Sequence, residues 1–137
     1  GMPTNVYYVS ISGFDTHFNQ VNQQSRLLEN YAESVKVFTE ELKRNNKLND
    51  VVVMTFSEFG RRVKQNASGG TDHGTANNVF LIGGNLKRPT VLNEAPNLKD
   101  LDDGDLKFSV DFREIYASLL RNCLNVNDVA ILGKRFE

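Results

Sequence analysis

Two runs of consecutive apolar residues flank a stretch with helical periodicity in the first half of the chain. Val6–Ile11 is rich in β-branched and aromatic residues, and Val51–Phe56 is a second continuous apolar run. Runs without alternation are typical of strands that are covered on both faces. Between them, apolar residues recur every three or four positions and predict one face of a helix, namely Leu27, Tyr31, Val35, Phe38 and Leu42. We expect this helix to begin at Gln24 or Ser25 and to end at Asn45–Asn46.

The order strand, helix, strand predicts a βαβ unit. Such units form parallel sheets with right-handed crossovers, so we expect Val6–Ile11 and Val51–Phe56 to be neighbours or near neighbours. Val79–Ile82, which ends at a glycine pair, is a third predicted strand. The expected fold class is therefore α/β, with a parallel-sheet core and flanking helices.

The remaining segments carry weaker signals. Lys64–Thr71 is polar and contains glycine, which predicts a loop, and Lys87–Lys107 is predicted to be a surface loop with a minor hairpin. Asp111 followed by Glu114 is a plausible capping box for a last helix. One face of that helix would carry Ile115, Leu119 and Cys123. We expect Cys123 to be a small buried residue. Val129–Phe136 is too short to assign.

The length, net charge and cysteine content of the chain limit which kinds of partner and cross-link are expected. A chain of 137 residues is one domain's worth, and its net charge of −1 without a basic run gives no reason to expect nucleic acid or an anionic membrane surface as a partner. The single cysteine excludes an internal disulfide, and no apolar run approaches the length of a membrane span. Gly1-Met2-Pro3 is typical of a tag remnant, so the absence of a signal peptide says little about the compartment.

The two histidines are the strongest chemical signal. Each lies within two positions of an aspartate, in Asp15-Thr16-His17 and in Asp72-His73-Gly74, and both pairs fall in predicted loops at one edge of the sheet. Zinc and manganese are bound by this mixture of imidazole and carboxylate. The alternative is that both are ordinary surface or hydrogen-bonded loop histidines.

Two charged residues after the second strand extend this hypothesis. Glu58 is predicted to be a metal ligand or an acceptor that holds an imidazole, and the alternative is a strand-end residue paired with an arginine. Arg61, or else Arg62, is predicted to bind an anionic substrate oxygen. We expect one pocket to collect Asp15, His17, Glu58 and His73, with Asp72 and Arg61 beside it.

Three blocks together resemble a known family. They are Ser12-Gly13-Phe14-Asp15-Thr16-His17, Thr55-Phe56-Ser57-Glu58-Phe59-Gly60-Arg61-Arg62 and Gly70-Thr71-Asp72-His73-Gly74. In order and spacing they look like the signature blocks of the bacterial family catalogued as domain of unknown function 1501. That family is similar to the alkaline phosphatase and sulfatase superfamily, whose carboxy-terminal half this chain would represent.

The resemblance implies roles for individual residues. Asp15 and His17 correspond to the superfamily's first aspartate and histidine, although the spacing here is Asp-x-His and not Asp-x-x-x-His. Ser57-Glu58 stands at the place of an Asp-His pair, and His73 at the place of the last histidine. An alternative register places Asp72-His73 on the Asp-His pair. Asp111–Leu124 resembles the closing helix.

The function implied is that of a partial catalytic domain of a metal-dependent hydrolase of phosphate or sulfate esters. Its cofactor would be a divalent metal such as zinc or manganese, and its substrate a small anionic ester. The superfamily's nucleophile would precede Val6, so residues 1–137 would be a single α/β domain, either a fragment or a partial version of a larger one, with the catalytic nucleophile unknown. The parent would be exported or periplasmic. The alternative is a non-catalytic module for binding or assembly. An open sheet edge also predicts a homo-oligomer.

Overall fold

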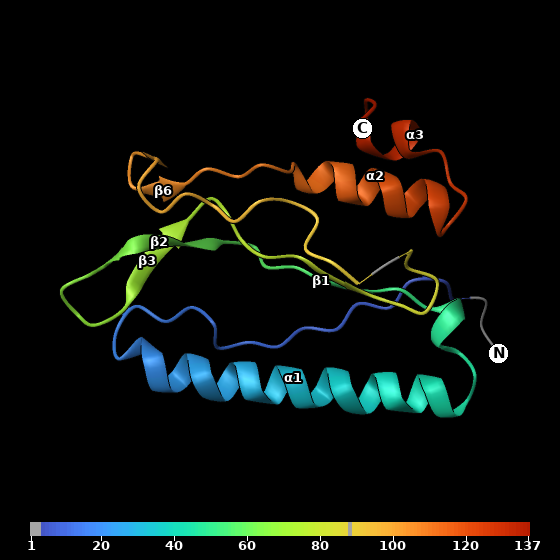
Figure 1. Ribbon diagram of the computed structural model, residues 1–137, viewed down its shortest axis with the longest axis horizontal. Coiled ribbons are helices and arrows are strands. Elements are labelled where there is room, and N and C mark those ends of the chain that lie inside the picture. The colour runs from blue at the N-terminus through green and yellow to red at the C-terminus, as the bar shows by residue number, and fades with distance from the viewer. Residues whose placement is uncertain (1–3, 88) are drawn as a thin grey trace. The chain divides into compact units, whose positions relative to one another are not determined.

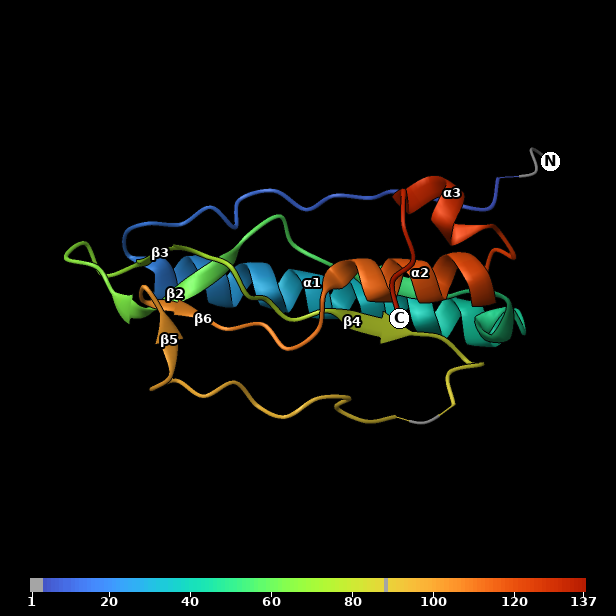
Figure 2. The ribbon, with the colours of Figure 1, turned by 90° about the horizontal axis from the view of Figure 1, so that it is seen from above.

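The computed structural model describes residues 4–87 and 89–137, which fall into two compact units. One unit is Ile11–Phe108, and the other joins Ser109–Glu137 to the segment that ends at Ser10. Figures 1 and 2 show the mixed α/β content, in which short strands accompany one long helix and smaller helical segments. All of the predicted site residues belong to the unit Ile11–Phe108.

The long helix α1 spans Gln20–Arg44. The residues at Leu27, Tyr31, Val35 and Leu42 are half-buried, as the periodicity predicts, but Phe38 is 49% exposed. The helix begins earlier than Gln24 because backbone bonds from Asn19 and Gln20 to the carbonyls of residues 68 and 69 hold its first turn. It ends as predicted, at Asn45, whose backbone N–H bonds to the carbonyl of Glu41.

The parallel-sheet prediction is wrong for the described residues. Strand β1 (Val53–Thr55) pairs antiparallel with β4 (Phe80–Ile82), with Met54 opposite Leu81. Residues 6–11 are extended and form no strand. Apolar β-branched residues favour an extended backbone but do not specify a hydrogen-bonding partner. A short 3₁₀ helix, η1 (Leu48–Asp50), precedes β1.

Two hairpins complete this unit. β2 (Gly60–Gln65) pairs antiparallel with β3 (Thr71–Gly74), and the predicted loop Lys64–Thr71 corresponds to the connection 66–70 between these strands. The prediction missed β2 because its sequence is too polar to show strand alternation. β5 (Leu101–Asp102) and β6 (Asp105–Leu106) form the predicted minor hairpin, and the turn residues Asp103 and Gly104 both have positive φ.

The second unit is helical. Helix α2 (Phe112–Asn122) has the predicted N-cap, because the carboxylate of Asp111 accepts a hydrogen bond from the Arg113 N–H. The tail contains α3 (Asp128–Leu132). Cys123 was predicted to be buried but is exposed, because it lies at the end of α2, and the fully buried position of that helix is Ala117.

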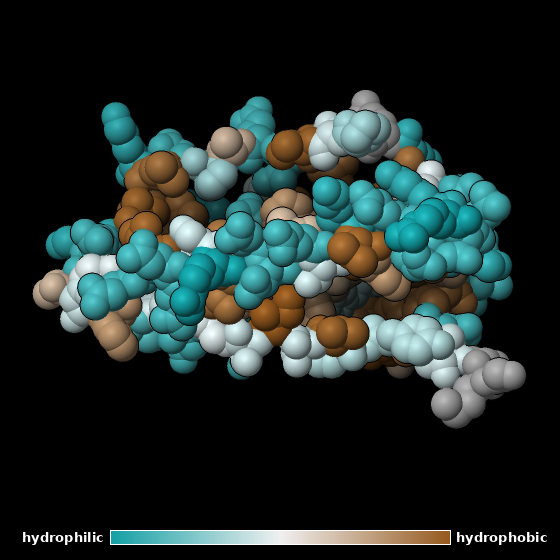
Figure 3. Space-filling model, turned by 90° about the horizontal axis from the view of Figure 1, so that it is seen from below, coloured by the Kyte–Doolittle hydropathy of each residue, from teal (hydrophilic) through white to brown (hydrophobic). Residues whose placement is uncertain are grey.

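Burial is sparse in the unit Ile11–Phe108. Among its described residues no apolar side chain is buried, and the buried positions are Thr16, Gly60 and Gly70. Figure 3 shows apolar side chains reaching the surface among polar ones. No helix in the described part of the chain is both long enough and apolar enough to span a bilayer.

Candidate metal site

The candidate site is built by two segments that are far apart in the chain. The segment before α1 carries Asp15 and His17, and strand β3 carries Asp72 and His73. The β2–β3 loop docks directly on the first segment, because Asn66 donates to the carbonyl of His17 at 3.0 Å. Gly70 permits this close approach because it has no side chain. A Cβ at this position would lie 2.4 Å from the carbonyl group of His17, which is too close for any other residue. The two segments are thus in backbone contact.

The buried hydroxyl of Thr16 fixes the segment before α1. Thr16 is 3% exposed, and its hydroxyl accepts bonds from Gln20 at 3.0 Å and from Gln24 at 3.1 Å. The Thr16 N–H also bonds to the carbonyl of Phe14 at 2.9 Å, closing a three-residue turn with Asp15 at its centre. The turn and the buried threonine hold the backbone on either side of the Asp15 carboxylate.

The side chains of Asp15, His17 and His73 meet at one carboxylate oxygen. The Nε2 atoms of His17 and His73 lie 2.9 Å and 2.8 Å from Oδ1 of Asp15, which is 58 positions from His73 in the chain. The two imidazole ring centroids are 4.9 Å apart. Potential ligand atoms of all three residues lie within 4.8 Å of one another. The side chains remain 44–64% exposed, so the cluster is open to solvent.

Asp72 takes a different place. Its Oδ1 lies 3.3 Å from Nδ1 of His17, on the ring nitrogen that does not face Asp15, and it accepts a bond from Asn66 at 3.2 Å. Metal-binding histidines commonly donate their second N–H to a carboxylate, which fixes the ring orientation. Asp72 is thus positioned to orient His17, and Asn66 to orient Asp72.

The hydrogen bonds in the cluster favour the ionised form of both aspartates. The bond from His73 lowers the pKa of Asp15 below its ordinary value, and His17 acts in the same direction. The bond from Asn66 lowers the pKa of Asp72, with a further contribution from His17. Deprotonated carboxylates are the form that binds cations.

Arg61 lies beside the cluster, where the sequence placed it, whereas Glu58 does not join the cluster. Glu58 is exposed and lies outside the cluster of Asp15, His17 and His73. The guanidinium of Arg61 donates to the backbone carbonyls of Phe14 and Thr71, so it is engaged within the protein. Arg62 is ion-paired with Asp105 at 3.3 Å.

Three contributing residues were not predicted from the sequence. The ring of Phe59 stacks on the imidazole of His73, with centroids 3.8 Å apart and planes 9° apart. The hydrogen bonds of Thr16 fix the segment before α1, and the bond from Asn66 to the His17 carbonyl joins the β2–β3 loop to that segment. Thr16 lies between the two predicted ligands of the first segment, and Phe59 lies in the block that contains Glu58 and Arg61. Both residues therefore fall within the blocks that the sequence singles out, but the sequence does not predict their contacts.

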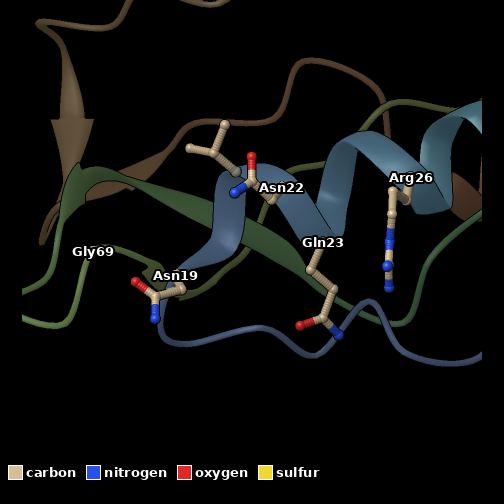
Figure 4. Close-up of a pocket in the computed structure, with 6 residues that line it drawn as sticks. Asn19, Asn22, Gln23, Arg26 and Gly69 are labelled. Atoms are coloured by element: carbon tan, nitrogen blue, oxygen red, sulfur yellow. The ribbon is translucent and has the colours of Figure 1, made fainter.

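A separate pocket of about 540 Å³ lies at the start of α1 (Figure 4). Figure 4 shows the side chains of Gln23 and Arg26 extending from the helix, with Asn19 and Gly69 at its beginning. None of the residues in the cluster lines this pocket. The candidate metal site is therefore distinct from it.

The comparisons with known proteins agree with the sequence blocks. Residues 4–128 match the family described as "Protein of unknown function (DUF1501)". No curated protein and no solved structure gave a significant match. Because the matched residues cover most of the chain, this protein belongs to the DUF1501 family.

Proposed function

We propose that the chain holds a first-row divalent cation through Asp15, His17 and His73, as the metal-binding part of a hydrolase of phosphate or sulfate esters. The observation that carries this proposal is the position of His17 between two carboxylates, at 2.9 Å from Asp15 and 3.3 Å from Asp72. A neutral imidazole has one N–H and donates to only one of them. A cation shared by Asp15 and His17 Nε2 leaves the Nδ1 hydrogen free to bond to Asp72.

The donor set fits such an ion. Two imidazole nitrogens and one carboxylate oxygen are ligands of zinc and related metals. A tetrahedral ion with bonds near 2.1 Å separates its ligand atoms by about 3.4 Å. The separations of 2.8 and 2.9 Å are hydrogen-bond distances that small side-chain rotations would widen. Three protein ligands with exposed side chains leave a coordination position open, as catalytic sites require and structural sites do not.

The ester-hydrolase reading rests on the chemistry and order of these residues. A bound divalent metal supplies Lewis acidity that polarises a phosphoryl or sulfuryl oxygen. Asp15 and His17, followed by His73, occur in the order that resembles the alkaline phosphatase and sulfatase superfamily. The likeness lies in this order and not in the small antiparallel sheets. Thr16 is buried and already accepts bonds from two glutamines, so we assign it no nucleophilic role.

Titration calorimetry with Zn²⁺ and with Mn²⁺ tests metal binding. The exposed thiol of Cys123 also attracts zinc, so the titration uses a Cys123→Ser background. We expect one ion per chain, with binding abolished by Asp15→Asn, His17→Ala or His73→Ala. Glu58→Gln, the matched control, should bind as the parent does. Absence of binding, or equal loss in Glu58→Gln, would refute the ligand set.

A second titration tests the substrate class. Inorganic phosphate or sulfate should bind the zinc-loaded chain and not the metal-free chain, because the open metal position would take an anionic oxygen. If the chain binds zinc but neither anion, the hydrolase proposal gives way to a non-catalytic metal-binding module.

A further inference from the structure

We infer that Arg61 is a positioning residue that joins the two ligand-bearing segments, and not a substrate-binding residue. The inference rests on the metal site proposed above, although the contacts that carry it involve no metal. One guanidinium nitrogen donates to the carbonyl of Thr71, and another donates to the carbonyl of Phe14. The second nitrogen also lies 3.4 Å from the hydroxyl of Thr16.

The two acceptors explain why these bonds matter. Phe14 immediately precedes Asp15, and Thr71 immediately precedes Asp72 and His73. One rigid, planar group therefore bonds to the backbone beside each part of the metal site. Guanidinium carries five N–H donors in a fixed plane, whereas an ammonium group is a compact point charge on a flexible stem. Lysine cannot reproduce both bonds in the same geometry.

Arg61 also supports His73 across the β2–β3 pair. The two residues are directly opposite each other in the register, so their side chains lie on one face of the hairpin. The Arg61 guanidinium lies 5.1 Å from the centre of the Phe59 ring, and that ring stacks on the imidazole of His73. Arg61 is thus linked to the site through Phe14, Thr71 and Phe59.

Half-burial distinguishes Arg61 from a surface arginine. Both bonds are part-buried, and both would break if the side chain turned toward a ligand, although the Phe14 carbonyl would keep the Thr16 N–H as a donor. Arg62, the next residue on β2, instead makes an ion pair with Asp105 and bonds to neither ligand-bearing segment. It provides a matched control of the same type on the same strand.

The experiment compares Arg61→Gln, Arg61→Lys and Arg62→Gln in two measurements. Zn²⁺ titration in the Cys123→Ser background should show a weakening of about 10–100-fold for Arg61→Gln, the range typical of residues that support metal ligands, and a smaller loss for Arg61→Lys. In the metal-free protein, nuclear Overhauser contacts between the ring protons of His17 and His73 should be present in the parent and lost in Arg61→Gln. Arg62→Gln should keep both properties.

The two measurements separate the two proposals. If the parent binds no zinc, the metal site fails, and the histidine contacts alone decide the role of Arg61. Parental zinc affinity and intact ring contacts in Arg61→Gln would overturn the inference, as would an equal loss in Arg62→Gln. Should Arg61→Gln fail to fold by circular dichroism, Arg61→Lys decides: unchanged zinc affinity and ring contacts in that variant overturn the inference.

Discussion

At the scale of single residues, the site depends on polar groups that would not bind the metal themselves. Thr16 is the clearest case, because its hydroxyl accepts bonds from Gln20 and Gln24 beside the turn that carries Asp15. The sequence marked Asp15, His17 and His73 through their residue types, since few side chains bind metals. It did not mark Thr16 or Asn66, because their roles arise from contacts between distant segments.

Replacing Thr16 with valine should lower the free energy of unfolding by about 1–3 kcal/mol, because the glutamine donors lose their buried acceptor while the side-chain volume is retained. Thr16→Ser keeps the hydroxyl and should be much closer to the parent. Urea denaturation followed by circular dichroism measures both variants. Equal stability of Thr16→Val and Thr16→Ser would show that the hydroxyl contributes nothing.

At the scale of elements, helices were predicted better than strands. The periodicity of α1 and the cap of α2 are local signals, so the sequence located both helices and one end of each. Strand pairing is a property of two segments, and the apolar run 51–56 carried no information that β4 would pair with it antiparallel. The polar β2–β3 hairpin, which carries Arg61 and His73, was missed because it has no apolar face.

Helix α2 should lose stability in acid. Hydrogen bonds from the Arg113 side chain and backbone lower the pKa of Asp111 from 3.8 to about 2. Because the folded pKa lies below the unfolded value, this contribution is complete above about pH 4 and is lost as pH falls toward 2. Helicity measured by circular dichroism should therefore decline through this window. Asp15 and Asp72 shift in the same direction, so the comparison with a variant is required.

Asp111→Asn is the suitable variant, because asparagine keeps the capping acceptor but does not titrate. Its helicity should vary less with pH between 4 and 2 than that of the parent. An identical acid transition in both proteins would assign the loss to other carboxylates.

At the scale of the whole molecule, the decisive feature is the scarcity of buried apolar side chains. A chain of this length ordinarily hides roughly two thirds of its unfolded surface. Here the buried apolar residues of the described chain are Ala117 and Phe136, both outside Ile11–Phe108. On α1, Leu28 is 54% exposed and Val37 is 61% exposed. The unit Ile11–Phe108 therefore has little hydrophobic core.

The urea m-value of the chain should accordingly be small, because m is proportional to the surface that unfolding exposes. We expect a broad transition with m near the low end of the usual range, about 1 kcal/mol/M, together with binding of the apolar dye ANS under native conditions. Val37→Ala should change the free energy of unfolding by no more than about 0.5 kcal/mol, as at an ordinary surface position. A steep transition without dye binding, or a large cost for Val37→Ala, would mean that the chain buries these side chains in solution, and light scattering would then show whether self-association covers them.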